Sequence, residues 1–218
     1  MRWPKIHKEA REPKDSSEAD VQLAERLKRQ DEHAFLILYD RHRRSVYRFL
    51  MHMTGSIAAA EELTQEVFVV ILDAICVGNF GQFDPEKGTL EGYLLGIARN
   101  LAREERRKSH RMVYLEDMLD VSEGNNQLME PEGRTWDAAQ LLVARSELAL
   151  LYRAILGLPD HYREVVVLCS LQEKTYQEAA AILQCSEGTI ASRMNRAKAL
   201  LSAKLRRSAP DEANLNAI

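Results

Sequence analysis

Two helices separated by a tight turn are predicted from the stretch Thr175-Tyr-Gln-Glu-Ala-Ala-Ala-Ile-Leu-Gln-Cys-Ser-Glu-Gly-Thr-Ile-Ala-Ser-Arg-Met-Asn-Arg-Ala-Lys198. Thr175 and Glu178 have the spacing of a capping box, which satisfies two backbone amides at the start of a helix. The box predicts a short helix that runs to about Leu183. Ser186 is a second N-cap, and apolar residues recur at helical spacing after it: Ile190, Met194, Ala197, Leu201 and Leu205. The stretch therefore predicts a helix-turn-helix.

The second helix of this pair carries hydrogen-bonding and cationic side chains along its outer side: Ser192, Arg193, Arg196 and Lys198. From Arg193 to Arg207 the sequence holds cations and no acid. Such groups suit the base edges and phosphates of a DNA major groove. A plain helical hairpin is the alternative, but the capping box, the tight turn and the concentrated charge together favour DNA binding.

The composition of the whole chain limits the remaining function classes. The 218 residues are 45% hydrophobic, with a formal net charge of −3, which allows two modest domains with buried cores. The three cysteines are too few and too widely spaced for a disulfide framework or a four-ligand zinc site. We find no phosphate-binding glycine loop, nucleophile elbow or acid-base pair, and therefore expect no enzyme activity, no cofactor and no metal. No apolar run approaches the roughly 20 residues of a membrane span, so we expect a cytoplasmic protein without membrane insertion.

The N-terminal half is predicted to be a helical bundle. Residues 1–20 are charged and lack periodicity, which predicts a disordered arm. Helical periodicity begins at Val21, and Gly55 and Ser56 are a natural helix end and helix start. The next helix has an acidic outer side, followed by a loop at 78–88 that contains Phe80 and Phe83. Thr89 can cap a further helix, whose end at 99–111 is rich in arginine.

The sequence thus predicts an all-α fold with two small domains, an N-terminal helix bundle at 21–111 and a helix-turn-helix domain at 140–207. Residues 112–139 are polar and irregular and are predicted to form a flexible linker; residues 208–218 are a C-terminal tail. At about 3.3 Å per residue, a linker of roughly 30 residues could span about 30 base-pair steps of 3.4 Å. The two domains could therefore contact separate segments of one DNA.

Five motifs in order resemble a bacterial RNA polymerase sigma factor of the extracytoplasmic-function (ECF) group, in the sigma-70 family. Three segments resemble region 2 of that family: Glu61-Glu-Leu-Thr-Gln-Glu-Val-Phe68, Phe83-Asp-Pro-Glu-Lys-Gly-Thr89 and Ile97-Ala-Arg-Asn-Leu-Ala102. Two segments resemble region 4: Leu158-Pro-Asp-His-Tyr-Arg-Glu-Val165 and Gly188-Thr-Ile-Ala-Ser-Arg193. Glu173 and Gln184 depart from the pattern, because glycine is frequent at these turns; we expect the local geometry there to differ.

The resemblance implies a function in transcription initiation. Such a protein binds core RNA polymerase, at its clamp and flap regions, and directs it to promoter DNA on the nucleoid, and an anti-sigma factor can be a further partner. Region 2 melts the −10 element and region 4 recognises the −35 element. Carried onto this sequence, the polymerase-binding residues are Glu62, Gln65, Glu66 and Phe68. The −10 residues are Asn79, Phe80, Phe83, Arg99, Asn100, Arg103 and Arg107, and the −35 residues are Glu187, Thr189, Ser192, Arg193, Arg196 and Lys198.

Three alternatives remain open at this point. Phe80 and Phe83 could stack on flipped bases or simply fill a core. The chain could be a helix-turn-helix regulator that binds duplex operators without polymerase. It could also be a protein-interaction scaffold that does not bind DNA.

Overall fold

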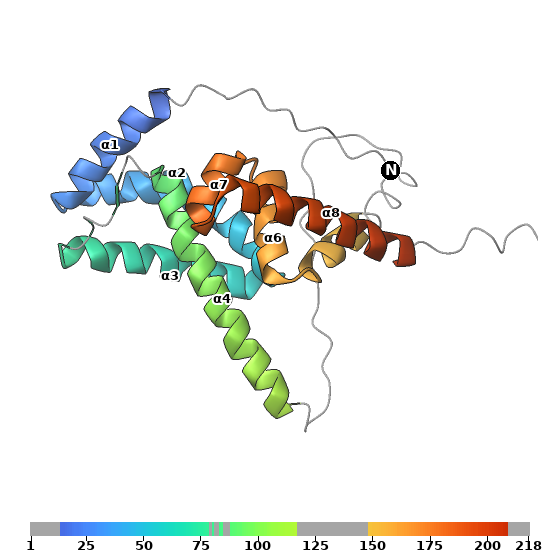
Figure 1. The fold of residues 1–218 in the computed structure, drawn as a ribbon. Coiled ribbons are helices and arrows are strands. Elements are labelled where there is room, and N and C mark those ends of the chain that lie inside the picture. The colour runs from blue at the N-terminus through green and yellow to red at the C-terminus, as the bar shows by residue number, and fades with distance from the viewer. Residues whose placement is uncertain (1–13, 79, 81–82, 85–87, 117–147, 209–218) are drawn as a thin grey trace, which may run out of the picture.

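The computed structural model describes residues 14–78, 80, 83–84, 88–116 and 148–208, and the regular structure in these ranges is helical (Figure 1). The first four helices are α1 (Lys14–Lys28), α2 (Glu32–Thr54), α3 (Ile57–Cys76) and α4 (Leu90–Glu116). A helical segment at 148–156 follows, and then α6 (Asp160–Val166), the π-helix η2 (Val167–Leu171), α7 (Tyr176–Leu183) and α8 (Glu187–Ser208). The all-α prediction is confirmed.

Local capping sets the boundaries of the N-terminal helices. The Asp31 carboxylate accepts hydrogen bonds from the amides of His33 and Ala34, so α2 begins at the next residue. Gly55 ends α2 with a left-handed φ of 75°, and Ser56 caps α3. The turn between the two helices is therefore short, and they pack as neighbours around a core that includes Leu38, Phe49, Val67 and Ile71.

The predicted disordered arm is wrong for its last part, because α1 begins at Lys14. Asp20 explains why this segment is ordered. Its buried carboxylate accepts a hydrogen bond from the Leu90 amide at the start of α4, at 3.2 Å, and pairs with Arg41 at 3.4 Å. This contact spans 70 residues of sequence, so composition near residue 20 could not reveal it. Residues 1–13 lie outside the described ranges.

The C-terminal helices are close to those expected. The capping box at Thr175 and Glu178 is complete, and α7 and α8 form the predicted helix-turn-helix. Helix α6 continues into the π-helix η2, in which the Gln172 amide donates to the Val167 carbonyl. The wider turn directs Gln172 toward the N-terminal bundle, where its amide nitrogen donates to the Ser45 carbonyl at 3.2 Å.

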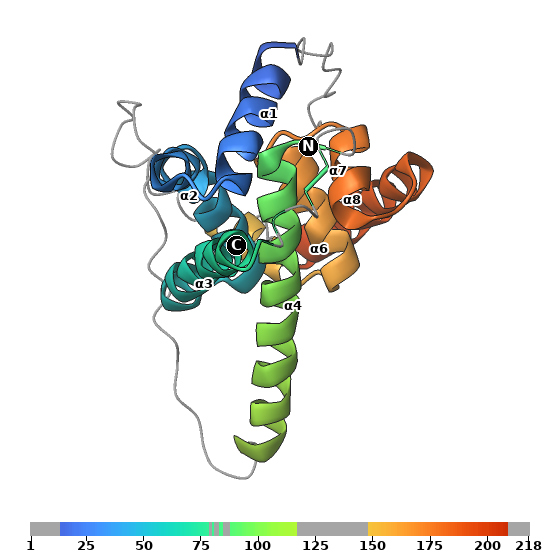
Figure 2. The same ribbon diagram turned by 90° about the vertical axis from the view of Figure 1, so that its left-hand side faces the viewer.

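The two halves of the chain lie against each other. Both views place α4 between the α2–α3 pair and the C-terminal helices, with the far end of α4 projecting beyond them (Figures 1 and 2). Gly92, in the first turn of α4, lies against α7: a Cβ there would be 3.5 Å from Ile182, in ordinary van der Waals contact. The sequence predicted the two domains but not this contact. Most of the predicted linker at 112–139 lies outside the described residues, although α4 covers its first five positions.

Within the part of the chain that the structure describes, no helix has both the length and the apolar character that a bilayer span requires.

Candidate nucleic-acid interface

Helix α8 separates an apolar face from a polar one. Ile190, Met194, Ala197 and Leu201 are buried in the domain core. The Ser186 hydroxyl accepts the Thr189 amide at 3.2 Å and so fixes the start of the helix. Of the predicted −35 residues, Glu187, Ser192 and Arg196 are exposed, whereas Thr189, Arg193 and Lys198 are partly buried. The polar face is therefore presented to solvent from the first turn onward.

The turn that positions α8 achieves a left-handed backbone without glycine. Gln184 follows α7 with φ 53°, and the Cys185 amide closes the turn on the Ala180 carbonyl at 3.0 Å. Glu173, in the turn before α7, has φ 57°. Both residues thus occupy the conformation that glycine adopts at least cost. The expected difference in local geometry is therefore not seen at either turn: the backbone is left-handed, and the departure is in the residue type alone.

The predicted polymerase-binding residues divide into two groups. Glu62, Gln65 and Glu66 are exposed on the outer side of α3, and the neighbouring Val69 is 53% exposed. Phe68 is buried instead, with its ring edge-on to Tyr39 at a centroid distance of 4.8 Å. Phe68 therefore supports α3 from inside, while the acidic and apolar outer side is open to a protein partner.

The loop aromatics of the −10 set are packed inward. Phe80 and Phe83 are 1% and 4% exposed, and both rings contact Tyr93, at centroid distances of 6.3 and 5.7 Å. In this conformation they fill a core, which was one of the two alternatives at these positions. Asn79 lies outside the described residues.

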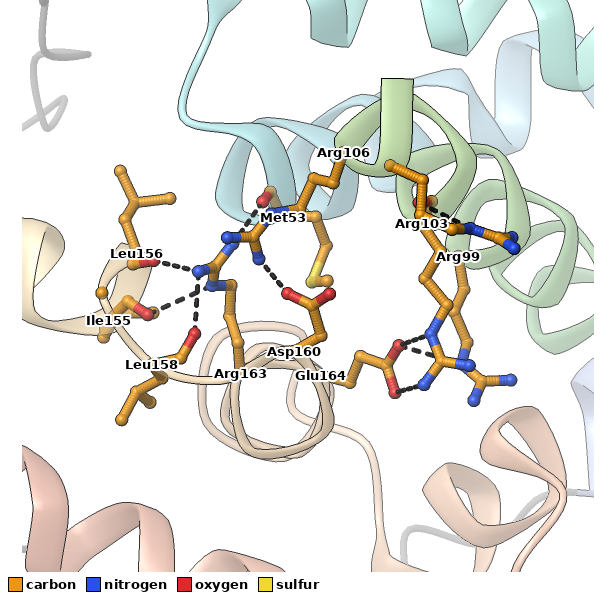
Figure 3. A network of polar contacts seen from close by, with 12 residues as sticks. Met53, Arg99, Arg103, Arg106, Ile155, Leu156, Leu158, Asp160, Arg163 and Glu164 are labelled. Atoms are coloured by element: carbon orange, nitrogen blue, oxygen red, sulfur yellow. Dashed lines mark hydrogen bonds and ion pairs between the residues drawn. The ribbon is translucent and has the colours of Figure 1, made fainter. Parts of the chain in front are cut away.

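The arginines of the −10 set differ in their accessibility. Asn100 and Arg107 are exposed on α4. Arg99 and Arg103 instead face Glu164 of α6, whose side chain is 0% exposed (Figure 3). Arg103 binds this carboxylate through both of its oxygens, at 2.6 and 3.1 Å, and Arg99 Nε forms a 3.1 Å ion pair without hydrogen-bond geometry.

Comparison with known proteins agrees with this architecture. Residues 38–112 match the family model for sigma-70 region 2, and residues 148–201 match that for sigma-70 region 4. The ECF sigma factor EcfG of Rhodopseudomonas palustris is 34% identical over 161 residues, 74% of this chain and 79% of that protein. SigM of Bacillus subtilis is 31% identical over 175 residues, 80% of this chain and 97% of that protein. This chain belongs to the ECF sigma factors.

As a sigma factor, the protein is a non-catalytic subunit that binds RNA polymerase and directs promoter-specific initiation through regions 2 and 4. The family prediction is thereby confirmed over the operator-binding regulator and the scaffold. Among solved structures, CnrH in complex with the cytosolic domain of CnrY is similar with a TM-score of 0.61 and 25% identity. The similarity covers 88% of this chain and 99% of that chain, and so includes both domains.

Sequence reasoning missed Arg163, a buried cation of region 4 with one hydrogen bond across the sigma factor's domain contact. This side chain is 2% exposed and donates to four backbone carbonyls (Figure 3): Met53 at 2.8 Å, Ile155 at 3.2 Å, Leu158 at 2.8 Å, and Leu156. Burial lowers the pKa of Arg163 to about 10, which leaves it protonated at neutral pH. Because its partners are backbone carbonyls, the side-chain pattern of the sequence gave no signal for this role.

A second polar cluster joins the sigma factor's domains near the start of α4. Lys174 pairs with Glu91 at 2.5 Å, and Ser45 donates to the same carboxylate. Burial opposes ionisation of Glu91, but the Lys174 ammonium and the two hydrogen bonds outweigh it and lower the pKa of that carboxyl. Glu91 is therefore ionised at neutral pH, and its contact with Lys174 is an ion pair between regions 2 and 4.

Proposed function

We propose that this sigma factor reads the two promoter elements with separate domains: region 4 recognises the −35 element through α8, and region 2 recognises and melts the −10 element. The exposed polar face at the start of α8, with Glu187, Ser192 and Arg196, is the observation that carries the first assignment. A recognition helix contacts base edges mainly through its N-terminal residues. The buried apolar face of α8 holds these side chains in a fixed direction.

For the −10 element, Asn100 and Arg107 are the accessible members of the predicted set. We infer that they make the first contacts with the DNA. Extruding a base costs a few kcal/mol, which base stacking at about 1–3 kcal/mol and phosphate contacts can offset without ATP. Phe80 and Phe83 either support the loop from inside or, after a rearrangement of the loop, provide the stacking surface.

For the polymerase, we propose that Glu62, Gln65 and Glu66 on α3 bind the clamp, with region 4 on the flap. Exposed carboxylates beside an exposed valine suit a protein surface that is both basic and apolar. Binding to polymerase and promoter DNA places the protein in the cytoplasm, on the nucleoid. Because CnrH forms a complex with CnrY and resembles both domains of this chain, we also propose a regulatory protein partner of the anti-sigma type.

Run-off transcription with purified core polymerase tests the assignment of α8. The template is selected by the wild-type protein from a library with randomised −35 and −10 positions. Arg196→Ala should lower transcription from it by about five- to 150-fold, because one base-specific contact is worth about 1–3 kcal/mol. Arg206→Ala is the matched control, since it removes the same charge about 15 Å further along the helix, at 1.5 Å per residue.

Two results would contradict this proposal. Equal transcription from the Arg196→Ala and Arg206→Ala proteins would remove α8 from −35 recognition. An unchanged preference of the Arg196→Ala protein among −35 sequences would show that the residue binds only the backbone.

A further inference from the structure

Helix α1 precedes the residues that match region 2, yet it reaches the start of α4. The match begins at residue 38, whereas α1 spans 14–28. Leu23, Ala24 and Leu27 are buried in the hydrophobic core, so α1 is an integral part of the N-terminal bundle. Figure 2 shows it beside the first part of α4. The similarity to region 2 does not explain what this helix contributes.

Asp20 of α1 supplies an acceptor that α4 itself lacks. The first four amides of a helix have no carbonyl partner within that helix. The Thr89 hydroxyl accepts one of them, the Gly92 amide, at 3.0 Å. Leu90 is only 1% exposed, so its amide needs a partner from the protein. Asp20 Oδ2 accepts this amide at 3.2 Å, and the helix dipole favours a negative charge at this end of α4.

The two oxygens of the Asp20 carboxylate have different partners. Oδ2 caps α4, whereas Oδ1 lies 3.4 Å from Nη1 of Arg41 on α2. The Asp20 side chain is 10% exposed and that of Arg41 is 44% exposed, so the arginine can turn into water if its partner is lost. Substitutions can therefore remove the cap and the ion pair separately.

The capped turn of α4 also supports the aromatic residues of the predicted −10 set. Tyr93 belongs to this turn, because its amide donates to the Thr89 carbonyl at 3.0 Å. Its ring contacts the rings of both Phe80 and Phe83. A shift of the first turn of α4 would therefore move the surface on which both phenylalanine rings pack.

We propose that Asp20 is a positioning residue for recognition of the −10 element. It acts through α4: by capping the first turn it fixes Tyr93, and Tyr93 in turn fixes Phe80 and Phe83. Binding sites tolerate displacements of only about 0.5 Å, so loss of the cap should disturb base recognition before it unfolds the bundle. The inference rests on the proposed assignment of region 2 to the −10 element, and it makes α1 a part of the promoter-reading domain.

Run-off transcription by the holoenzyme, reconstituted with the full chain, tests the proposal through two ratios. The −10 preference is transcription from the template selected by the wild-type protein divided by transcription from the same template with a scrambled −10 element. The −35 preference is defined in the same way. A variant that is merely less stable lowers transcription from all templates alike and leaves both ratios unchanged. Asp20→Ala should lower the −10 preference at least about fivefold, as for loss of one weakly stacked base, and leave the −35 preference unchanged.

Three further variants separate the cap from other effects. Asp20→Asn keeps an oxygen that can accept the Leu90 amide, so it should retain most of the −10 preference. Arg41→Ala removes the ion pair but leaves the cap, and should have the preference of the wild type. Asp20→Leu has the same branched shape without an acceptor and should behave as Asp20→Ala does. It replaces Asp20→Ala if circular dichroism shows that the latter is misfolded.

The outcomes distinguish this proposal from the assignment of region 2. If Asp20→Ala and Asp20→Leu keep the wild-type −10 preference, Asp20 has no positioning role; a loss in Asn100→Ala alone, at an exposed residue of the predicted −10 set, shows that the region 2 assignment stands. Positioning through the cap is also refuted if Asp20→Asn or Arg41→Ala is as defective as Asp20→Ala, or if the −35 preference falls equally. If the wild-type protein has no −10 preference, the region 2 assignment itself is wrong, and the role of Asp20 with it.

Discussion

Replacing Arg163 with methionine should destabilise region 4 far more than any surface change. The substitution keeps a long side chain but removes the guanidinium donors that reach the carbonyls of Ile155, Leu156 and Leu158; the Ile155 carbonyl still accepts the Leu158 amide at 3.0 Å. These carbonyls belong to the end of the helical segment at 148–156 and the turn after it, where no further helical turn supplies amide donors. The side chain of Arg163, which belongs to α6, therefore caps the C-terminal end of the helical segment at 148–156.

The magnitude follows from opposing contributions. A hydrogen bond from a charged donor is worth about 1.5–3 kcal/mol, so three of them set an upper limit of about 5–9 kcal/mol. Burial of the guanidinium works against this: a pKa lowered from 12.5 to about 10 corresponds to a cost of roughly 3 kcal/mol. We expect a net loss of about 3–5 kcal/mol, a large share of the 5–15 kcal/mol that stabilises an ordinary domain.

Hydrogen exchange is the suitable assay, because the chain has two domains and one unfolding curve would mix them. Exchange of α6 amides should accelerate by at least about a hundredfold, while α3 amides change much less. Arg153→Met is the matched control, since Arg153 is exposed on the same helical segment. Equal exchange in the two variants would refute the role of Arg163 as an internal cap.

Three further substitutions have predictable effects on stability. Burial lowers the pKa of His52 below its usual 6.5, so the unfolded chain binds the proton first and the free energy of unfolding falls as the pH drops below 6.5. His52→Phe keeps the ring contact with Tyr152 and should reduce this loss of unfolding free energy between pH 7 and 5. An unchanged loss in the variant would contradict the role of His52. Gln184→Gly should stabilise region 4 by up to about 1 kcal/mol in urea melts, because left-handed strain outweighs the added freedom of the unfolded chain. Gln30→Gly, also at positive φ, should instead lower the free energy of unfolding, because it removes the side-chain amide of Gln30, which donates to the carbonyls of Ile75 and Cys76. Stabilisation by both glycine substitutions would show that these hydrogen bonds contribute nothing.

Local signals in the sequence were sufficient for the helices. Thr175, Ser186, Gly55 and Ser56 mark helix ends through contacts that span only a few residues, and all four do so in the structure. The exposed face of α8 follows from the same kind of information, because burial of one helical face determines the direction of the other. The outer side of α3 was predictable for the same reason.

Contacts between distant residues could not be predicted in this way. The residue types at Phe80 and Phe83 suit both stacking on bases and packing against Tyr93, and only the fold decides between the two. The basic segment at 99–111 likewise gives no sign that three of its arginines face acids about 60 residues later. Arg163 was overlooked because its partners are backbone carbonyls, which leave no trace in the side-chain pattern.

The chemistry of the domain contact bears on its role. A permanent interface would be expected to be chiefly apolar, since burying apolar area stabilises without the desolvation cost of charge. Here the contact holds ion pairs, Lys174 with Glu91 and Arg103 with Glu164, beside apolar residues of both domains that belong to one core cluster. The second pair uses Arg103, one of the residues that we propose to bind −10 DNA, so under that proposal Arg103 can bind the DNA only after it releases Glu164.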